Sequence, residues 1–153
     1  MIQLSEHFSL PEFGQGIPAA CIPTFQTMCT QILEPIREYV ETAIYITSGY
    51  RSLEKNEAVH GQENSEHMAT ADYCAVDFFC PKVPSVFAWL TQNQNLPYHQ
   101  LILETGRLGF VIHISWNRLK PGVRSVLSGA TENSQPYERV AHVEFNPSPE
   151  VNA

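Results

Sequence analysis

Two apolar segments of this chain each carry one ionisable side chain near their middle. The first is Tyr73–Cys80 (YCAVDFFC), in which Asp77 has apolar neighbours on both sides, and the second is Phe110–Trp116 (FVIHISW), which contains His113. Their β-branched and aromatic content predicts two buried strands. An unpaired carboxylate or imidazole would be costly in such strands, so the fold must supply each with a polar partner.

The rest of the chain predicts helices that cover a sheet. Apolar residues recur every three or four positions from Pro23 to Val40, which is typical of an amphipathic helix, and Ser52–Val59 and Val83–Gln94 are further helix candidates. The remaining strand candidates are Ala43–Tyr50, Gln100–Glu104, Arg124–Leu127 and Glu138–Phe145. We therefore expect an α+β fold with a mostly antiparallel sheet covered by helices.

A hairpin loop is expected between two of these strands. The segment Thr105–Gly109 (TGRLG) has glycines where positive φ angles are needed. If residues 105–108 form a four-residue loop, Glu104 pairs with Gly109. Glu104 then shares a face with His113, but lies about four residue pairs, or ~13 Å, away along the strand.

Length and charge restrict the classes of function. The 153 residues, of which 43% are hydrophobic and 16% charged, fit one packed domain over residues 1–153, with a flexible Pro-rich tail from about residue 146. The net charge of −7 argues against binding to nucleic acid. No apolar run approaches the roughly 18 residues that span a bilayer. The four cysteines form no Cys-x-x-Cys pair, so we expect reduced, buried thiols.

Three side chains are candidates for one zinc site. The imidazoles of His67 and His113 and the carboxylate of Asp77 are ligands of the kind found in catalytic zinc sites, where a fourth position is left for water. Zinc would lower the pKa of that water toward ~7, and a nearby carboxylate could then take its proton. Glu104, which closes the apolar run QLIL, is our candidate for this base.

An arginine follows directly after a hydrophobic strand candidate. Arg51 lies two positions after Gly49, where a guanidinium can bind a carboxylate or a developing oxyanion. Ordinary structural roles are also open for these residues. Asp77 could form a salt bridge with Arg51, and His113 could be a core histidine bonded to a backbone carbonyl.

The ordered motifs of the chain resemble one family. HFSLPEF, TSGYRS, Asn56 with Val59-His60-Gly61, SEH…AVDFF, QLILE and VIHIS follow the order found in zinc D-Ala-D-Ala carboxypeptidases and related murein endopeptidases. That family shares its fold with the hedgehog signalling domain, and the resemblance covers roughly residues 7 to 120. It implies a zinc peptidase of hedgehog/DD-peptidase-like fold that hydrolyses peptide bonds next to D-amino acids in peptidoglycan by metal-activated water.

The resemblance also implies a set of metal ligands. The family pattern S-x-H-x-x-G-x-A-x-D implies a ligand at His67 and another at an aspartate, and His113 matches the histidine of the family's VHxS strand. Asp77 stands three residues later than the pattern requires, and Thr70 replaces the glycine. Either an insertion precedes the strand or Asp72 is the ligand. The apolar flanks of Asp77 favour Asp77.

The remaining site residues also follow from the resemblance. Glu104 matches the family's catalytic acid, and Arg51 matches the arginine that orients the substrate and steadies the oxyanion. The resemblance also implies that Ser65 and Tyr50 bind the substrate. Some members carry the acid three residues before the histidine, where this chain has Phe110.

Two functions are compatible with these motifs. The first is a zinc-dependent D-Ala-D-Ala carboxypeptidase or murein endopeptidase whose partner is a peptidoglycan peptide. The alternative is a non-catalytic, zinc-containing member of the same fold that binds the cell wall or has a structural role, because both diagnostic spacings are stretched. The first ten residues lack the features of a secretion signal. We therefore expect a cytoplasmic protein, or one delivered to the cell wall by a phage or another non-classical route. The oligomeric state is left open.

Overall fold

The two apolar segments that carry Asp77 and His113 form neighbouring strands near the centre of a six-stranded sheet. The computed structural model describes residues 1–93, 95–106, 109–130 and 138–144, so the tail from residue 146 lies outside the described residues. The strand order is β1-β2-β4-β3-β5-β6. The strands are β1 (Tyr45–Ser48), β2 (Tyr73–Phe79), β3 (Gln100–Gly106), β4 (Gly109–Asn117), β5 (Val123–Ala130) and β6 (Glu138–Glu144).

The sheet is mixed, where the sequence predicts a mostly antiparallel one. β5 pairs with β3 in the parallel sense, while the other neighbouring pairs are antiparallel. The parallel pairing results from the connection after β4. This connection crosses over the end of the sheet where β3 starts, so that β5 begins beside the start of β3 and runs in the same direction. The backbone of His99, just before β3, bonds both to Ser115 on β4 and to Ser125 on β5, and so fixes this crossing. The α+β class is confirmed.

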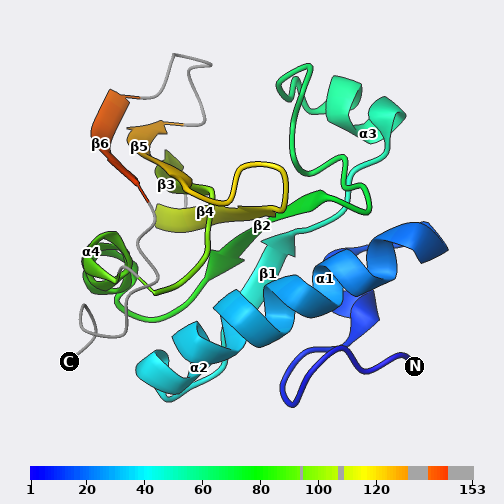
Figure 1. Ribbon diagram of the computed structural model, residues 1–153, viewed down its shortest axis with the longest axis horizontal. Coiled ribbons are helices and arrows are strands. Elements are labelled where there is room, and N and C mark those ends of the chain that lie inside the picture. The colour runs from blue at the N-terminus through cyan, green and yellow to red at the C-terminus, as the bar shows by residue number, and fades with distance from the viewer. Residues whose placement is uncertain (94, 107–108, 131–137, 145–153) are drawn as a thin grey trace.

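One long helical rod covers a face of the sheet (Figure 1). It consists of α1 (Ile22–Met28), a π-helical segment η3 (Cys29–Leu33) and α2 (Glu34–Val40). Pro35 lacks an N–H group and cannot continue the α-helical hydrogen-bond ladder, which accounts for the wider turns before it. There, the N–H of Glu34 bonds to the carbonyl of Cys29, five residues earlier. The helix predicted from Pro23 to Val40 is thus confirmed, with a π segment inside it.

The other helices are short. The 3₁₀ turns η1 (Leu10–Phe13) and η2 (Ala19–Cys21) precede the rod, α3 (Leu53–Ala58) follows β1, and α4 (Val83–Gln92) follows β2. α3 lies on the opposite side of the sheet from the rod (Figure 1). Among the described residues, no helix combines the length and apolar character needed to cross a membrane.

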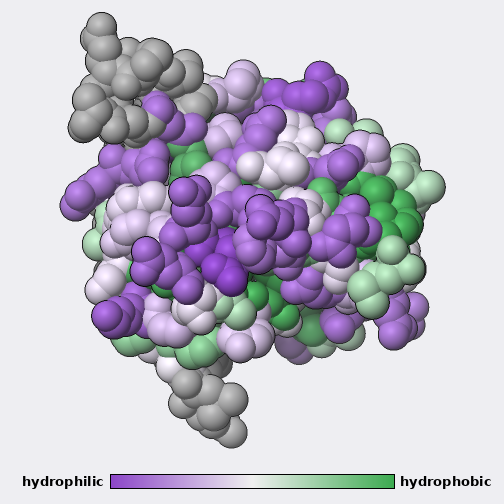
Figure 2. All heavy atoms as spheres, turned by 90° about the horizontal axis from the view of Figure 1, so that it is seen from below, coloured by the Kyte–Doolittle hydropathy of each residue, from purple (hydrophilic) through white to green (hydrophobic). Residues whose placement is uncertain are grey.

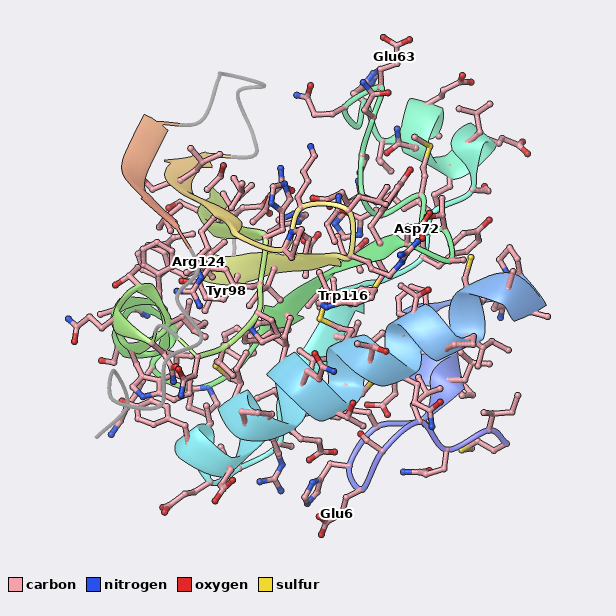
Figure 3. All side chains as sticks on the ribbon, viewed as in Figure 1. Glu6, Glu63, Asp72, Tyr98, Trp116 and Arg124 are labelled. Carbon is pink, nitrogen blue, oxygen red and sulfur yellow. The ribbon has the colours of Figure 1, made fainter. Side chains whose placement is uncertain are left out.

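Successive side chains of each strand point to opposite faces of the sheet, one of which is packed and the other polar. The packed face lies under the helices and is fully buried at Val76, Phe78, Ile112 and Ile114. Trp116 lies between this face and the rod (Figure 3). All four cysteines are buried and unpaired, as expected. Hydrophilic side chains cover most of the outer surface seen in Figure 2, while green apolar residues gather on its right-hand side.

The predicted hairpin loop is too long. Thr105, Gly106 and Gly109 belong to the strands, and Gly106 pairs with Gly109. Gly109 has a φ angle of 122°, which glycine adopts without the steric cost that a Cβ would bring. As a result, Glu104 pairs with Val111 and not with Gly109, and the register moves toward His113.

Candidate metal centre

Three buried side chains from three separate segments meet on the polar face of the sheet. Asp77 on β2 pairs directly with His113 on β4, and His67 reaches them from the loop before β2. His67 Nε2 lies 3.1 Å from Asp77 Oδ1 and 3.2 Å from His113 Nδ1, and the last two atoms are 2.9 Å apart. This group has the composition and closeness of a metal site.

A loop on the edge of the sheet orients His67. Its Nδ1–H donates to the carbonyl oxygen of Gly49 at 2.7 Å, and its own carbonyl accepts from the N–H of Arg51. A carbonyl oxygen can only accept, so the ring proton of neutral His67 lies on Nδ1. The lone pair of Nε2 therefore faces the other two side chains.

The second imidazole is oriented in the same manner by β3. His113 Nε2 lies 3.1 Å from Oε1 of Gln100, which accepts its hydrogen. Nδ1 then carries the lone pair that faces Asp77 and His67. Both histidines thus have a hydrogen-bond partner on the nitrogen that does not face the centre, as metal-binding histidines almost always do.

The carboxylate of Asp77 is shared between the histidines and a cation. Oδ1 faces the two imidazoles, while Oδ2 lies 3.5 Å from Nη2 of Arg51. The guanidinium also donates from Nε to the hydroxyl of Ser48, at 3.3 Å. Arg51 is thus the cationic partner of Asp77, and this pairing holds the carboxylate in one orientation.

The electrostatics of the metal-free group follow from these contacts. Burial by itself would raise the pKa of Asp77, but the charges and hydrogen bonds of His67 and His113 outweigh it and lower that pKa. Burial likewise opposes protonation of His113, yet its hydrogen bond to Asp77 and the negative charges of Asp77, Glu104 and Glu66 raise its pKa. The centre therefore attracts positive charge.

The donor set fits a divalent metal ion such as zinc. When both histidines are neutral, three electron pairs face one another within 3.2 Å, and a metal cation between them would relieve their repulsion. Ligands at about 2.0–2.1 Å from tetrahedral zinc lie about 3.3 Å apart, close to the distances found. Among the residues that the structure describes here, two buried carboxylates, Asp77 and Glu66, lie near the guanidinium of Arg51, so a divalent ion would also offset the local negative charge.

Glu104 lies nearer to this group than the sequence predicts. His113 pairs with Ile102 across β3 and β4, and Glu104 is two residues beyond Ile102 on the same face. Such diagonal neighbours are about 7–8 Å apart, in place of the ~13 Å expected from a longer loop. The proximity is also seen in the effect of the Glu104 charge on the pKa of His113.

The other predicted site residues lie around this group in different roles. The Ser65 hydroxyl accepts from the N–H of His67 at 3.2 Å, and so shapes the turn that presents the imidazole. Tyr50 is half-buried and lines a shallow hollow together with Ser52 and Lys55. Asp72, the alternative ligand, forms a salt bridge with Arg118 near the start of β2 and is not part of the histidine group (Figure 3).

Three residues that support the centre were not identified from the sequence. Gly49 and Gln100 accept from the two imidazoles, and the buried Glu66 lies beside His67. Gln100 alternates with Ile102 and Glu104 along β3, so its position on the polar face was a usable signal. The contribution of Gly49 is a backbone carbonyl, for which a side-chain pattern holds no signal.

A second group of metal-competent side chains lies on the surface. Glu6, His7 and Glu34 are close together, and Glu6 and His7 are exposed. Here Nδ1 of His7 donates to Glu34 at 2.7 Å, so this nitrogen is engaged in a hydrogen bond and its lone pair is not presented. The cluster connects the N-terminal loop to α2.

A buried His-Asp-His group on the polar face of an α+β sheet defines this chain as a candidate metalloprotein. Comparison with known families gives the particular kind: residues 9–115, or 107 of the 153, match the family described as peptidase M15. The chain belongs to the peptidase M15 family, whose members depend on zinc, and the resemblance to zinc D-Ala-D-Ala carboxypeptidases is confirmed. A comparison with curated proteins gives no match.

Proposed function

We propose that this protein is a zinc peptidase that hydrolyses peptide bonds next to D-amino acids in bacterial peptidoglycan, on a hedgehog/DD-peptidase-like fold. The observation that carries the proposal is the convergence of His67, Asp77 and His113, with the outer nitrogen of each imidazole engaged in a hydrogen bond. Membership of the peptidase M15 family supplies the class of reaction.

In this proposal the three residues hold zinc through His67 Nε2, His113 Nδ1 and Asp77 Oδ1. Zinc, when bound, supplies a Lewis acid and lowers the pKa of water toward ~7. The Glu104 carboxylate, on the same face of the sheet, takes a proton from the attacking water and returns it to the leaving amine. Glu104 is a diagonal neighbour of His113 across β3 and β4, which places it on the side of the sheet where the zinc would be held.

Arg51 has a double role in the proposal. Its Nη2 group contacts Asp77 and its Nε group contacts Ser48, which leaves the two hydrogens of Nη1 as the donors that we propose for the substrate. These hydrogens can bind a substrate carboxylate or the oxyanion that develops during hydrolysis. Tyr50, which precedes Arg51 in the sequence, and Ser65, whose hydroxyl accepts from the N–H of His67, are proposed to contact the substrate.

A direct experiment tests the proposal. The purified protein is dialysed against zinc, its metal content is determined by atomic emission, and the release of D-alanine from a peptide ending in D-Ala-D-Ala is followed. Cleavage of purified murein is analysed in parallel. One bound zinc together with zinc-dependent hydrolysis supports the proposal. An all-L peptide of the same composition is the control and is expected to remain intact.

The outcomes of this experiment separate the alternatives. Release of D-alanine from the short peptide indicates a carboxypeptidase, and cleavage within murein cross-links indicates an endopeptidase. Zinc binding without hydrolysis of either substrate would favour the non-catalytic, cell-wall-binding alternative. Absence of zinc from the protein would contradict both.

A further inference from the structure

The Glu66 side chain connects the loop of His67 to the strand of His113. Only 9% of Glu66 is exposed. Its Oε1 accepts from the hydroxyl of Ser115 at 2.9 Å, and its Oε2 accepts from Nδ2 of Asn117 at 2.8 Å. Both donors lie on β4, on the same face as His113. The carboxylate thus bridges the two segments that carry the imidazoles.

The bridge continues through Ser115 to the second imidazole. The Ser115 hydroxyl accepts from the backbone N–H of Gln100 at 3.0 Å, and Oε1 of Gln100 accepts from Nε2 of His113 at 3.1 Å. Glu66, the neighbour of His67 in the sequence, is therefore linked through Ser115 to the backbone of Gln100, whose side chain fixes the tautomer of His113. These contacts tie the loop of His67 to the two strands that carry and orient His113.

The two hydrogen-bond donors that face Glu66 call for two acceptor oxygens, but they do not compensate for its buried negative charge. Among the ion pairs formed by the described residues, none includes Glu66, so its hydrogen-bond donors are neutral side chains. Burying a carboxylate against neutral donors costs more than burying an amide or an apolar group of similar size. A cation held nearby by the histidines would compensate for this cost.

We propose that Glu66 is a positioning residue for the metal: it holds the donor nitrogens of His67 and His113 in one preformed arrangement and adds negative charge beside the ion. The inference rests on the proposed zinc site. It assigns to Glu66 the kind of support that outer hydrogen-bond partners give to ligating histidines, whose loss weakens metal binding about 10–100-fold.

The test measures metal binding directly. Zinc affinity is determined by competition with a chromophoric chelator for the wild type, Glu66→Gln, Ser115→Ala and the double variant. The visible absorption of the Co²⁺-loaded proteins reports the ligand geometry, and urea unfolding of the chelator-treated proteins reports stability. Asp72→Asn is the matched control, because it breaks the salt bridge of Asp72 with Arg118, which ties the same loop to the chain after β4.

We expect Glu66→Gln and Ser115→Ala each to weaken zinc binding about 10–100-fold and to alter the cobalt spectrum. Because both act on one bridge, the double variant should lose less than the product of the two single effects. Asp72→Asn should change zinc affinity by no more than about twofold. Ser115→Ala, which keeps the charge of Glu66, carries the test if Glu66→Gln does not fold.

Unchanged zinc affinity and cobalt spectra in both single variants would overturn the inference while leaving the proposed zinc site standing. So would equal losses of zinc affinity in Glu66→Gln and Asp72→Asn, since these would reflect general loosening of the loop. A wild-type protein that binds no zinc would overturn the proposed function and this inference together.

Discussion

Acceptors outside the centre determine the tautomers of the His67 and His113 imidazoles. Gly49 O and Gln100 Oε1 each take one ring proton, so both lone pairs face Asp77. Asp77 is in turn held by Arg51. At the scale of single residues, the centre is a set of acceptors brought closer together than acceptors normally lie, and such a set favours a cation between them.

Replacing Asp77 tests whether the carboxylate is a ligand. Asp77→Asn keeps the size and removes the charge, so zinc affinity should fall by more than ~100-fold, beyond the effect expected for an outer partner. Asp72→Asn, at the alternative position, should leave it nearly unchanged. Competition with a chromophoric chelator measures both variants. Strong loss of zinc in Asp72→Asn alone would reverse the assignment of the ligand.

Replacing Glu104 separates proton transfer from metal binding. Glu104→Gln should lower kcat by about 10²–10⁴-fold, the usual contribution of general acid–base catalysis, while zinc content stays at the wild-type level. Glu63→Gln, at an exposed position well away from the sheet (Figure 3), is a suitable control and should retain full activity. Wild-type turnover in Glu104→Gln would remove it as the base.

At the scale of elements, the centre depends on a close contact between the end of β1 and the turn η1. A Cβ atom added to Gly49 would lie 2.4 Å from the carbonyl oxygen of Phe13, and the N–H of Tyr50 bonds to that same oxygen. Only glycine allows this approach. The contact places the carbonyl oxygen of Gly49 where it accepts the hydrogen bond from Nδ1 of His67.

We therefore expect Gly49→Ala to affect both stability and metal binding. The displaced backbone should destabilise the fold by about 1–3 kcal/mol, as overpacking of a buried site does. It should also weaken zinc binding, because the acceptor of His67 moves. Gly122→Ala is the control, since its Cβ would meet nothing within 4 Å. Urea unfolding and chelator competition measure the two effects, and a stable variant with unaltered zinc affinity would disprove the expectation.

The N-terminal loop is attached to the rod by Glu34, at the start of α2. Glu34 accepts hydrogen bonds of 2.7 Å from the Ser5 hydroxyl and from both the backbone and the ring of His7. Burial alone would raise the pKa of Glu34, but these hydrogen bonds lower it below its ordinary value. A lowered pKa means that the folded state favours the ionised form.

The lowered pKa of Glu34 determines how its contribution to the free energy of unfolding depends on pH. The stabilisation by Glu34 is present above the pKa of the unfolded chain, about 4.3, and is lost as the pH falls through the lower folded value. Glu34→Gln should thus reduce the free energy of unfolding at pH 7, and the difference from the wild type should shrink below about pH 4. Urea unfolding at pH 7 and pH 3.5 tests this. A difference that is equal at both values would contradict it.

The sequence predicts the elements better than it predicts how they pair. The apolar strands around Asp77 and His113 and the helix before Val40 follow from local composition and spacing. Pairing of Asp77 with His113 depends on the register of β2 against β4, which composition does not determine. The shorter hairpin at Gly109 moved Glu104 by two residue pairs, and only the turn conformation could have indicated this.

The site was predictable where side chains carry the chemistry. Asp77 and His113 stand out within apolar strands, His67 lies in a polar stretch and was favoured by the family motif, and Arg51 was a foreseeable partner for Asp77. The residues that support the candidate ligands were harder to predict from the sequence. Gly49 acts through its backbone, and Glu66 acts through Ser115 and Asn117, some fifty positions away in the sequence. Such contacts exist only once the sheet is assembled.

For the whole molecule, a ligand that binds only the folded state adds its binding free energy to stability. At free zinc one hundred times its dissociation constant, the gain is about 2.7 kcal/mol. For a chain of this size, that corresponds to a rise in Tm of roughly 5–10 °C. Differential scanning fluorimetry with zinc and with EDTA measures it. Asp77→Asn should show no such rise, and a wild-type Tm indifferent to zinc would contradict the proposed site.

The three donors are widely separated along the chain: His113 follows His67 by 46 positions and Asp77 by 36. No fragment that ends before β4 can gather them, so a nascent chain has no high-affinity place for the ion until its central hairpin has closed. Metal binding should therefore come late in the folding of each molecule. A chain that has bound its ion is therefore one in which the central sheet has already folded.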